Sequence, residues 1–103
     1  MICVTVDHRS MELTMQGHAD AQRNEQDHDL VCCAASTLLQ ALVYTLMDRD
    51  GISVMGDMES GHAHIRIKAS PQRMDTAQAA FRMAADGLQM LAEAYPDSIN
   101  IQK

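Results

Sequence analysis

The chain has 103 residues, of which 47% are apolar but only 3% aromatic, and a formal net charge of −6. This length suits one compact domain whose core is built from aliphatic side chains, alanine and methionine. Its eight Lys and Arg residues are scattered, which argues against a nucleic-acid-binding surface, and no apolar run is long enough to span a membrane.

The N-terminal residues and the cysteines predict the cellular compartment. Residues 1–7 have neither the basic region nor the long apolar region of a secretory signal, so we expect a cytoplasmic protein. Cys3, Cys32 and Cys33 lack the spacing of a disulfide framework, and we therefore expect reduced thiols. Nothing in the sequence calls for a cofactor, and we expect none.

The first part of the chain predicts a β-hairpin. Residues 2–7 alternate between apolar and polar side chains, which is the pattern of a half-buried strand. A turn is expected at residues 8–10, and residues 11–16 alternate again, as a hairpin partner would. The triplet Gly17-His18-Ala19 closes this second strand.

A polar segment and a long helix are expected next. Residues 20–28 are polar and aperiodic, which predicts an exposed loop. Asp29 suits the N-cap of a helix, because its carboxylate can accept hydrogen bonds from the first free N–H groups. Apolar residues at helical spacing predict that this helix continues to about Arg49, and Asp50-Gly51 would end it.

The second half of the chain repeats the pattern. Residues 52–58 and 62–68 are predicted strands joined by a turn at Ser60-Gly61, residues 71–95 a second helix, and residues 99–101 a short last strand. The order ββαββαβ predicts a single α+β domain over residues 1–103, with two helices and a mostly antiparallel sheet.

Cys32 and His18 could together form a catalytic pair. If Asp29 is the N-cap, Cys32 lies in the first helical turn, where the helix dipole favours a thiolate and free N–H groups can stabilise an oxyanion. A histidine at a strand end, such as His18, could hold this thiolate as an ion pair and protonate a leaving amine.

A family resemblance strengthens this hypothesis. The triplet Gly17-His18-Ala19, followed by the segment Asp-Leu-Val-Cys-Cys-Ala-Ala-Ser at residues 29–36, resembles the ribosomal-processing cysteine protease family, Prp. The resemblance implies that His18 and Cys32 are catalytic and that the fold is a homodimeric α+β fold. It also implies a substrate: a large-subunit ribosomal protein precursor, from which a short N-terminal extension is removed beside a bulky apolar residue.

The assignment of nucleophile and base leaves two alternatives open. Cys33 follows Cys32 directly, but neighbouring helical side chains point about 100° apart, so only one of them can face His18. His28 is a competing base. By the resemblance, Cys32 and His18 take precedence.

Other residues could support the site. Gly17 permits a close backbone approach beside His18. Ser36, one helical turn after Cys32, could donate a hydrogen bond to the thiolate or simply allow close packing. Asp29 could orient His18 instead of acting only as a cap, and Cys33 could also line the site.

The resulting expectation is a cysteine endopeptidase acting on a protein or peptide, such as a basic ribosomal protein precursor, without nucleic-acid or membrane partners. One alternative is a non-catalytic dimeric binding or assembly module; another is a mobile-element relative that processes a non-ribosomal protein. A zinc site at His62 and His64 has less support than an ordinary polar strand face. For the dimer, the small residues of the second helix would allow close packing; they are Ala77, Ala80 and Ala84.

Overall fold

The computed structural model describes residues 1–17, 25–59 and 61–103, and for residues 25–29 it describes the backbone only. The predicted element order ββαββαβ is confirmed. The strands are β1 (Ile2–Asp7), β2 (Glu12–Gln16), β3 (Ile52–Glu59), β4 (His62–Ala69) and β5 (Ile99–Gln102). The helices are α1 (Glu25–Leu46), the short 3-10 helix η1 (Pro71–Arg73) and α2 (Met74–Ala94).

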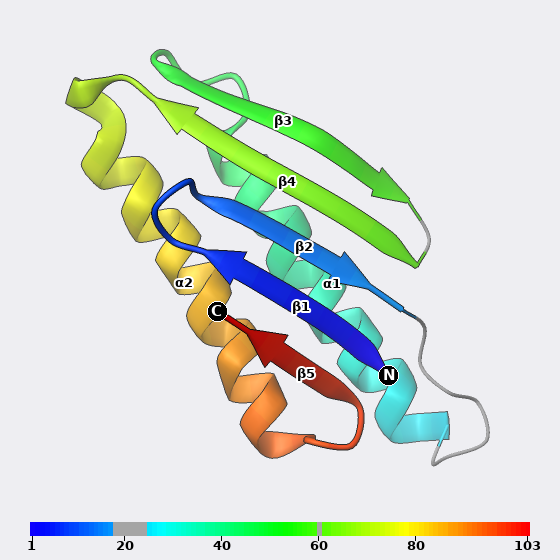
Figure 1. Ribbon diagram of the computed structural model, residues 1–103. Helices are drawn as coiled ribbons and strands as arrows, with labels where there is room; N and C mark the ends of the chain where they lie inside the picture. Colours follow the sequence, from blue (N-terminus) through cyan, green and yellow to red (C-terminus); the bar gives the residue numbers. More distant parts are fainter. Residues whose placement is uncertain (18–24, 60) are drawn as a thin grey trace.

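The five strands form one sheet with the order β3-β4-β2-β1-β5, and both long helices cover the same face of it (Figure 1). The pairs β1–β2, β2–β4 and β3–β4 are antiparallel, whereas β1 and β5 are parallel. The predicted α+β fold with a mostly antiparallel sheet is therefore confirmed. None of the described helices covers the other face of the sheet, which explains the alternation of apolar and polar residues along β1 and β4.

The core lies between the sheet and the two helices. Leu13 of β2, Leu39 of α1 and Leu88 of α2 have no exposed surface, and Phe81, the only phenylalanine, is 1% exposed. The ring of Phe81 meets that of His8 edge to face, with ring centroids 5.6 Å apart. Because the chain has so few aromatic residues, the packing of aliphatic side chains such as Leu13, Leu39 and Leu88 supplies most of the hydrophobic stabilisation.

The beginning of α1 differs from the prediction. The helix already includes Glu25, so the expected loop at residues 20–28 is wrong for residues 25–28, and Asp29 is the fifth helical residue rather than the N-cap. Residues 20–24 lie outside the described part. Apolar periodicity reveals only the part of a helix that packs on a core, whereas Glu, Gln and Asp are well tolerated in the first turns, where acidic groups oppose the helix dipole.

Two further expectations about the helices need correction. α1 ends at Leu46, three residues before Arg49, and the chain then turns through Asp48 and Gly51, both with positive φ. In α2, Ala77 and Ala84 are 0% and 3% exposed, so they pack into the core of this chain and are not available for a dimer. None of the described helices is both long enough and apolar enough to cross a membrane.

Candidate active site

A cavity of about 390 Å³ lies between α1 and the end of the sheet where β2 ends and β4 begins. α1 contributes Cys32, and the two strands contribute both apolar and polar residues. The complete lining is Ile2, Met15, Gly17, Cys32, Ser36, Gln40, Met58, Glu59, Gly61, His62 and Ala63. An apolar cavity wall with a few polar groups on one side is typical of a ligand-binding site.

One polar part of the cavity lining comes from a stripe of α1, in addition to Glu59 and His62. Cys32, Ser36 and Gln40 are spaced four residues apart, so they lie above one another on the same helix face. Ser36 was predicted as a site residue, whereas Gln40 was not. The helical spacing that pointed to Ser36 also extends to Gln40 and could have identified it.

The two adjacent cysteines have different surroundings. Cys32 is half-buried and lines the cavity, whereas Cys33 is exposed and is not part of the lining. The carbonyl of Cys33 accepts a hydrogen bond of 2.7 Å from the hydroxyl of Thr37 on the outer side of α1. As the helical geometry predicts, only one thiol of the pair faces the cavity.

The helical position of Cys32 is not the expected one. Cys32 is the eighth residue of α1, whereas the sequence placed it in the first turn. Free N–H groups and the positive end of the dipole are confined to the first turn, so neither lies beside the sulfur in this conformation. The side chains of Ser36 and Gln40 are instead the polar groups of α1 that share the cavity with the thiol.

Gly17 has a backbone conformation that only glycine adopts readily. Its φ is +108°, its N–H donates a 3.0 Å hydrogen bond to the carbonyl of Gly61, and a Cβ atom would lie 2.3 Å from the carbonyl oxygen of Met1. The expected close backbone approach at Gly17 is therefore present. His18 itself lies outside the described residues, as do the side chains of His28 and Asp29.

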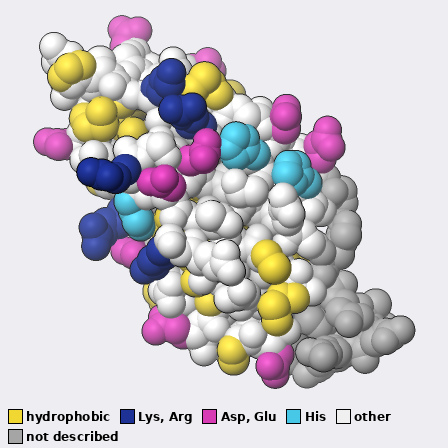
Figure 2. Space-filling model, viewed as in Figure 1, with side chains coloured by type: hydrophobic (Ala, Val, Ile, Leu, Met, Phe, Trp, Pro, Cys, Tyr) yellow, Lys and Arg dark blue, Asp and Glu magenta, His cyan; other side chains and the backbone are white. Residues whose placement is uncertain are grey.

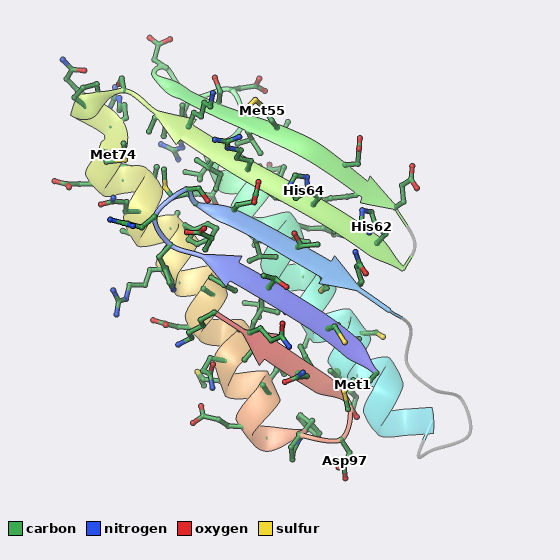
Figure 3. All side chains as sticks on the ribbon, in the orientation of Figure 1. Met1, Met55, His62, His64, Met74 and Asp97 are labelled. Atoms are coloured by element: carbon green, nitrogen blue, oxygen red, sulfur yellow. The ribbon has the colours of Figure 1, made fainter. Side chains whose placement is uncertain are left out.

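The histidines of β4 occupy the outer face of the sheet. His62 and His64 are labelled in Figure 3, where both project from the face that the helices do not cover. His64 Nε2 lies 3.1 Å from the carboxylate of Glu12 on the neighbouring strand, while His62 lies at the rim of the cavity. Within the described residues, no three His, Cys, Asp or Glu side chains are grouped so that they could hold a metal ion.

The charges near the cavity are acidic. Among the described residues of the lining, Glu59 is the only Asp or Glu and there is no Lys or Arg; Asp57 lies on the same strand, two residues before Glu59. On the face shown in Figure 2, Lys and Arg gather toward the end of the sheet where β1 runs into β2, whereas Asp and Glu are present at both ends. The described part of the cavity lining is therefore better suited to a cationic than to an anionic partner.

Comparison with known proteins agrees with this description. The sequence profile of the family described as "Cysteine protease Prp" matches residues 1–100. The chain is 31% identical to the ribosomal processing cysteine protease Prp of Staphylococcus aureus strain Mu50, over 97% of this chain and 92% of that protein.

Two solved structures of the S. aureus protease have the same fold. The structure in complex with a substrate peptide gives a TM-score of 0.74 at 27% identity, covering 98% of this chain and 95% of the other. The structure with a covalently linked product peptide gives a TM-score of 0.71 at 26% identity, with the same coverage. The chain therefore belongs to the Prp family and is a cysteine-type endopeptidase.

Proposed function

We propose that this endopeptidase removes a short N-terminal extension from a large-subunit ribosomal protein precursor, with Cys32 as nucleophile and His18 as base. The observation that carries the proposal is that Cys32 opens into the cavity, whereas Cys33 lies outside it. Gly17, the residue directly before His18 in the chain, lines the same cavity. A relative of similar sequence, from S. aureus, is a ribosomal processing protease, which supports this class of substrate.

The proposed reaction has two steps. The thiolate of Cys32 attacks the carbonyl carbon of the scissile peptide bond, and the C–N bond breaks as His18 protonates the leaving amine. Water then attacks the resulting thioester, releasing the new C-terminal carboxylate and restoring the Cys32 thiol. The solved S. aureus relative with a covalently linked product peptide is consistent with a covalent intermediate of this kind.

Stabilisation of the oxyanion is assigned to side chains of α1. Because Cys32 lies well inside the helix, its own N–H belongs to the regular helical hydrogen-bond pattern. Ser36 and Gln40 line the cavity beyond Cys32 and carry donors that could reach a negatively charged oxygen. Asp29, three residues before Cys32, retains its proposed role of orienting His18.

The acidic residues at the rim of the cavity, Asp57 and Glu59, favour a basic substrate. Glu59 lies in the cavity lining and Asp57 on the same strand, so cationic residues near the cut site would be attracted. Many ribosomal proteins are strongly basic because they bind RNA. A substrate of this kind would also place the protease in the cytoplasm, where ribosomes are assembled.

A homodimer is proposed through the outer surfaces of the two helices. Large apolar side chains are exposed there: Tyr44 and Met47 on or just after α1 are 81% and 47% exposed, and Met83 and Met90 on α2 are 71% and 69% exposed. From Leu30 to Met47, the chain has no charged residue. Such a surface is better suited to a protein contact than to water.

Light scattering should give the mass of two copies for the wild type and of one for Tyr44→Lys, whereas the control Thr5→Lys on the uncovered sheet face should remain dimeric.

The function is tested with short peptides that tile the N-terminal regions of large-subunit ribosomal protein precursors. Mass spectrometry should find one peptide cut at a single bond by the wild type and by Cys33→Ala, but not by Cys32→Ala or His18→Ala. Equal loss of activity in Cys33→Ala and Cys32→Ala would contradict the assignment of the nucleophile. If none of these peptides is cut but an unrelated protein is, the proposal of a ribosomal substrate would be wrong.

A further inference from the structure

The inner face of the sheet loses side-chain volume where it meets the cavity. Leu13 of β2 and Ile65 of β4 lie directly opposite each other on this face and are 0% and 3% exposed. Two residues nearer the cavity, Met15 of β2 lies opposite Ala63 of β4. Inward-facing side chains of a strand are two residues apart, so the methyl group of Ala63 takes the place that follows the branched side chain of Ile65. β4 therefore fills the core at Ile65 and leaves space at Ala63.

The next positions toward the end of the sheet have no side chain at all. Gly17 and Gly61 follow Met15 and precede Ala63 by two residues, and the N–H of Gly17 donates a 3.0 Å hydrogen bond to the carbonyl of Gly61. Both glycines line the cavity. Two strand residues span about 6.6 Å, so this glycine pair lies about that far outside the pair of Met15 and Ala63. Ala63 is therefore at the inner end of a space whose outer part the two glycines leave open.

Two methionines stand on either side of Ala63. Met58 of β3 lies opposite Ala63 on the strand beyond β4, just as Met15 does on β2. Neighbouring strands lie about 4.8 Å apart, so a gap of about two strand spacings separates the backbones that carry the two methionines. α1 closes the remaining side with Cys32 and Ser36, which line the same cavity. The space above Ala63 thus has flexible apolar walls and the thiol at its side.

We propose that Ala63 determines the size of the substrate side chain that enters the cavity, and that this side chain is a bulky apolar one such as that of Phe or Leu. It belongs to the substrate residue whose carbonyl carbon Cys32 attacks, because the side chain nearest to that carbonyl is the one on its own residue. The inference rests on the proposed function and deepens it. Apolar side chains are favoured because Met15, Met58 and Ala63 offer apolar surface.

The test uses a reagent that needs the thiol and this cavity but no natural substrate. Four tripeptide chloromethyl ketones differ only in their last residue, which is Phe, Leu, Val or Ala. The thiolate of Cys32 attacks the methylene carbon, a C–S bond forms, and the C–Cl bond breaks to release chloride. Peptide mass spectrometry gives the rate at Cys32, and the exposed Cys33 outside the cavity is the internal control.

The wild type should be modified fastest at Cys32 by the Phe and Leu reagents and slowest by the Ala reagent. Each CH₂ group that the reagent buries should raise the rate about fourfold. Cys33 should react at nearly the same rate with all four reagents. Equal rates of the four reagents at Cys32 would overturn the proposal.

Ala63→Leu should reverse the order, so that the Ala reagent reacts faster at Cys32 than the Phe and Leu reagents. The added isopropyl group would occupy the space that a bulky substrate side chain needs. Ala69→Leu, the same substitution at the other end of β4, is the matched control and should keep the wild-type order. Circular dichroism checks folding. If Ala63→Leu does not fold, Ala63→Val replaces it and should slow the Phe reagent more than the Ala reagent.

The outcomes separate this inference from the proposed function. If Ala63→Leu keeps the wild-type order of reagents, Ala63 does not determine the size, whether or not the ribosomal peptides are cut. If the order reverses but no ribosomal peptide is cut, the role of Ala63 is retained and the proposed ribosomal substrate is wrong.

Discussion

At the scale of single residues, the three cysteines allow a sharp test of the nucleophile. Cys3 and Cys33 are exposed and Cys32 is half-buried, so access alone would make Cys32 the slowest thiol to react. We expect the opposite order, with iodoacetamide modifying Cys32 first at neutral pH, because an activated nucleophile is partly thiolate. Peptide mass spectrometry of partially alkylated protein measures all three rates together.

The control for this experiment is His18→Ala. The advantage of Cys32 should disappear in this variant, while the rates of Cys3 and Cys33 should remain unchanged. If Cys32 reacts slowest in the wild type as well, as its burial predicts, the thiol is not activated in the free protein.

Gly17 is a second residue whose role can be measured separately from catalysis. Replacing it with Ala should lower the free energy of unfolding by about 1–3 kcal/mol, because φ is +108° and the new Cβ would meet the backbone carbonyl of Met1. Urea denaturation gives this value, and Gln16→Ala, at the last residue of β2, is the matched control. Equal stability of the two variants would mean that the backbone at this position relaxes without cost.

At the scale of elements, α1 and α2 approach closely where Gly87 faces Leu38. A Cβ atom at position 87 would lie 2.8 Å from both terminal methyl carbons of Leu38. Gly87→Ala should therefore be destabilising despite the helix propensity of Ala, which favours Ala over Gly by about 1 kcal/mol. In a Leu38→Ala background the methyl groups that the new Cβ would meet are absent. Gly87→Ala should then raise the free energy of unfolding by about 1 kcal/mol.

Denaturation of the wild type, both single variants and the double variant gives the coupling between the two positions. The change of sign is the decisive result, because helix propensity alone would make Gly87→Ala stabilising in both backgrounds. A stabilising effect of similar size in both would show that the Leu38 side chain moves aside freely.

At the scale of the whole molecule, the net charge of −6 and the acidic cavity rim predict an effect of salt on substrate capture. For a peptide with Lys or Arg beside the cut bond, kcat/KM should fall severalfold as ionic strength rises, because salt screens the attraction. A peptide with Gln at those positions should show little change. Equal salt dependence of the two peptides would assign the effect to general stability rather than to charge attraction.

The sequence by itself determined the order of elements and the class of the fold. Period-two alternation in residues 2–7 and 62–68 identified strands with one buried face, because side chains in a strand alternate strictly between core and solvent. The helical spacing from Val31 to Leu46 identified the part of α1 that packs on the sheet. The residues around Gly17 and Cys32 also identified the family, because a sequence motif can be recognised without knowledge of any long-range contact.

Only the tertiary structure decided which side chains share the cavity and how α1 begins. Local sequence patterns carry no information on long-range contacts, so they could not predict that Met15, Met58 and Gln40 line the same cavity as Cys32. It also placed the start of α1 at Asp29, because polar first turns carry no core-facing pattern. Among the described strands, β3 and β5 lie at the two edges of the sheet, and this order is set by how the hairpins and helices pack against one another.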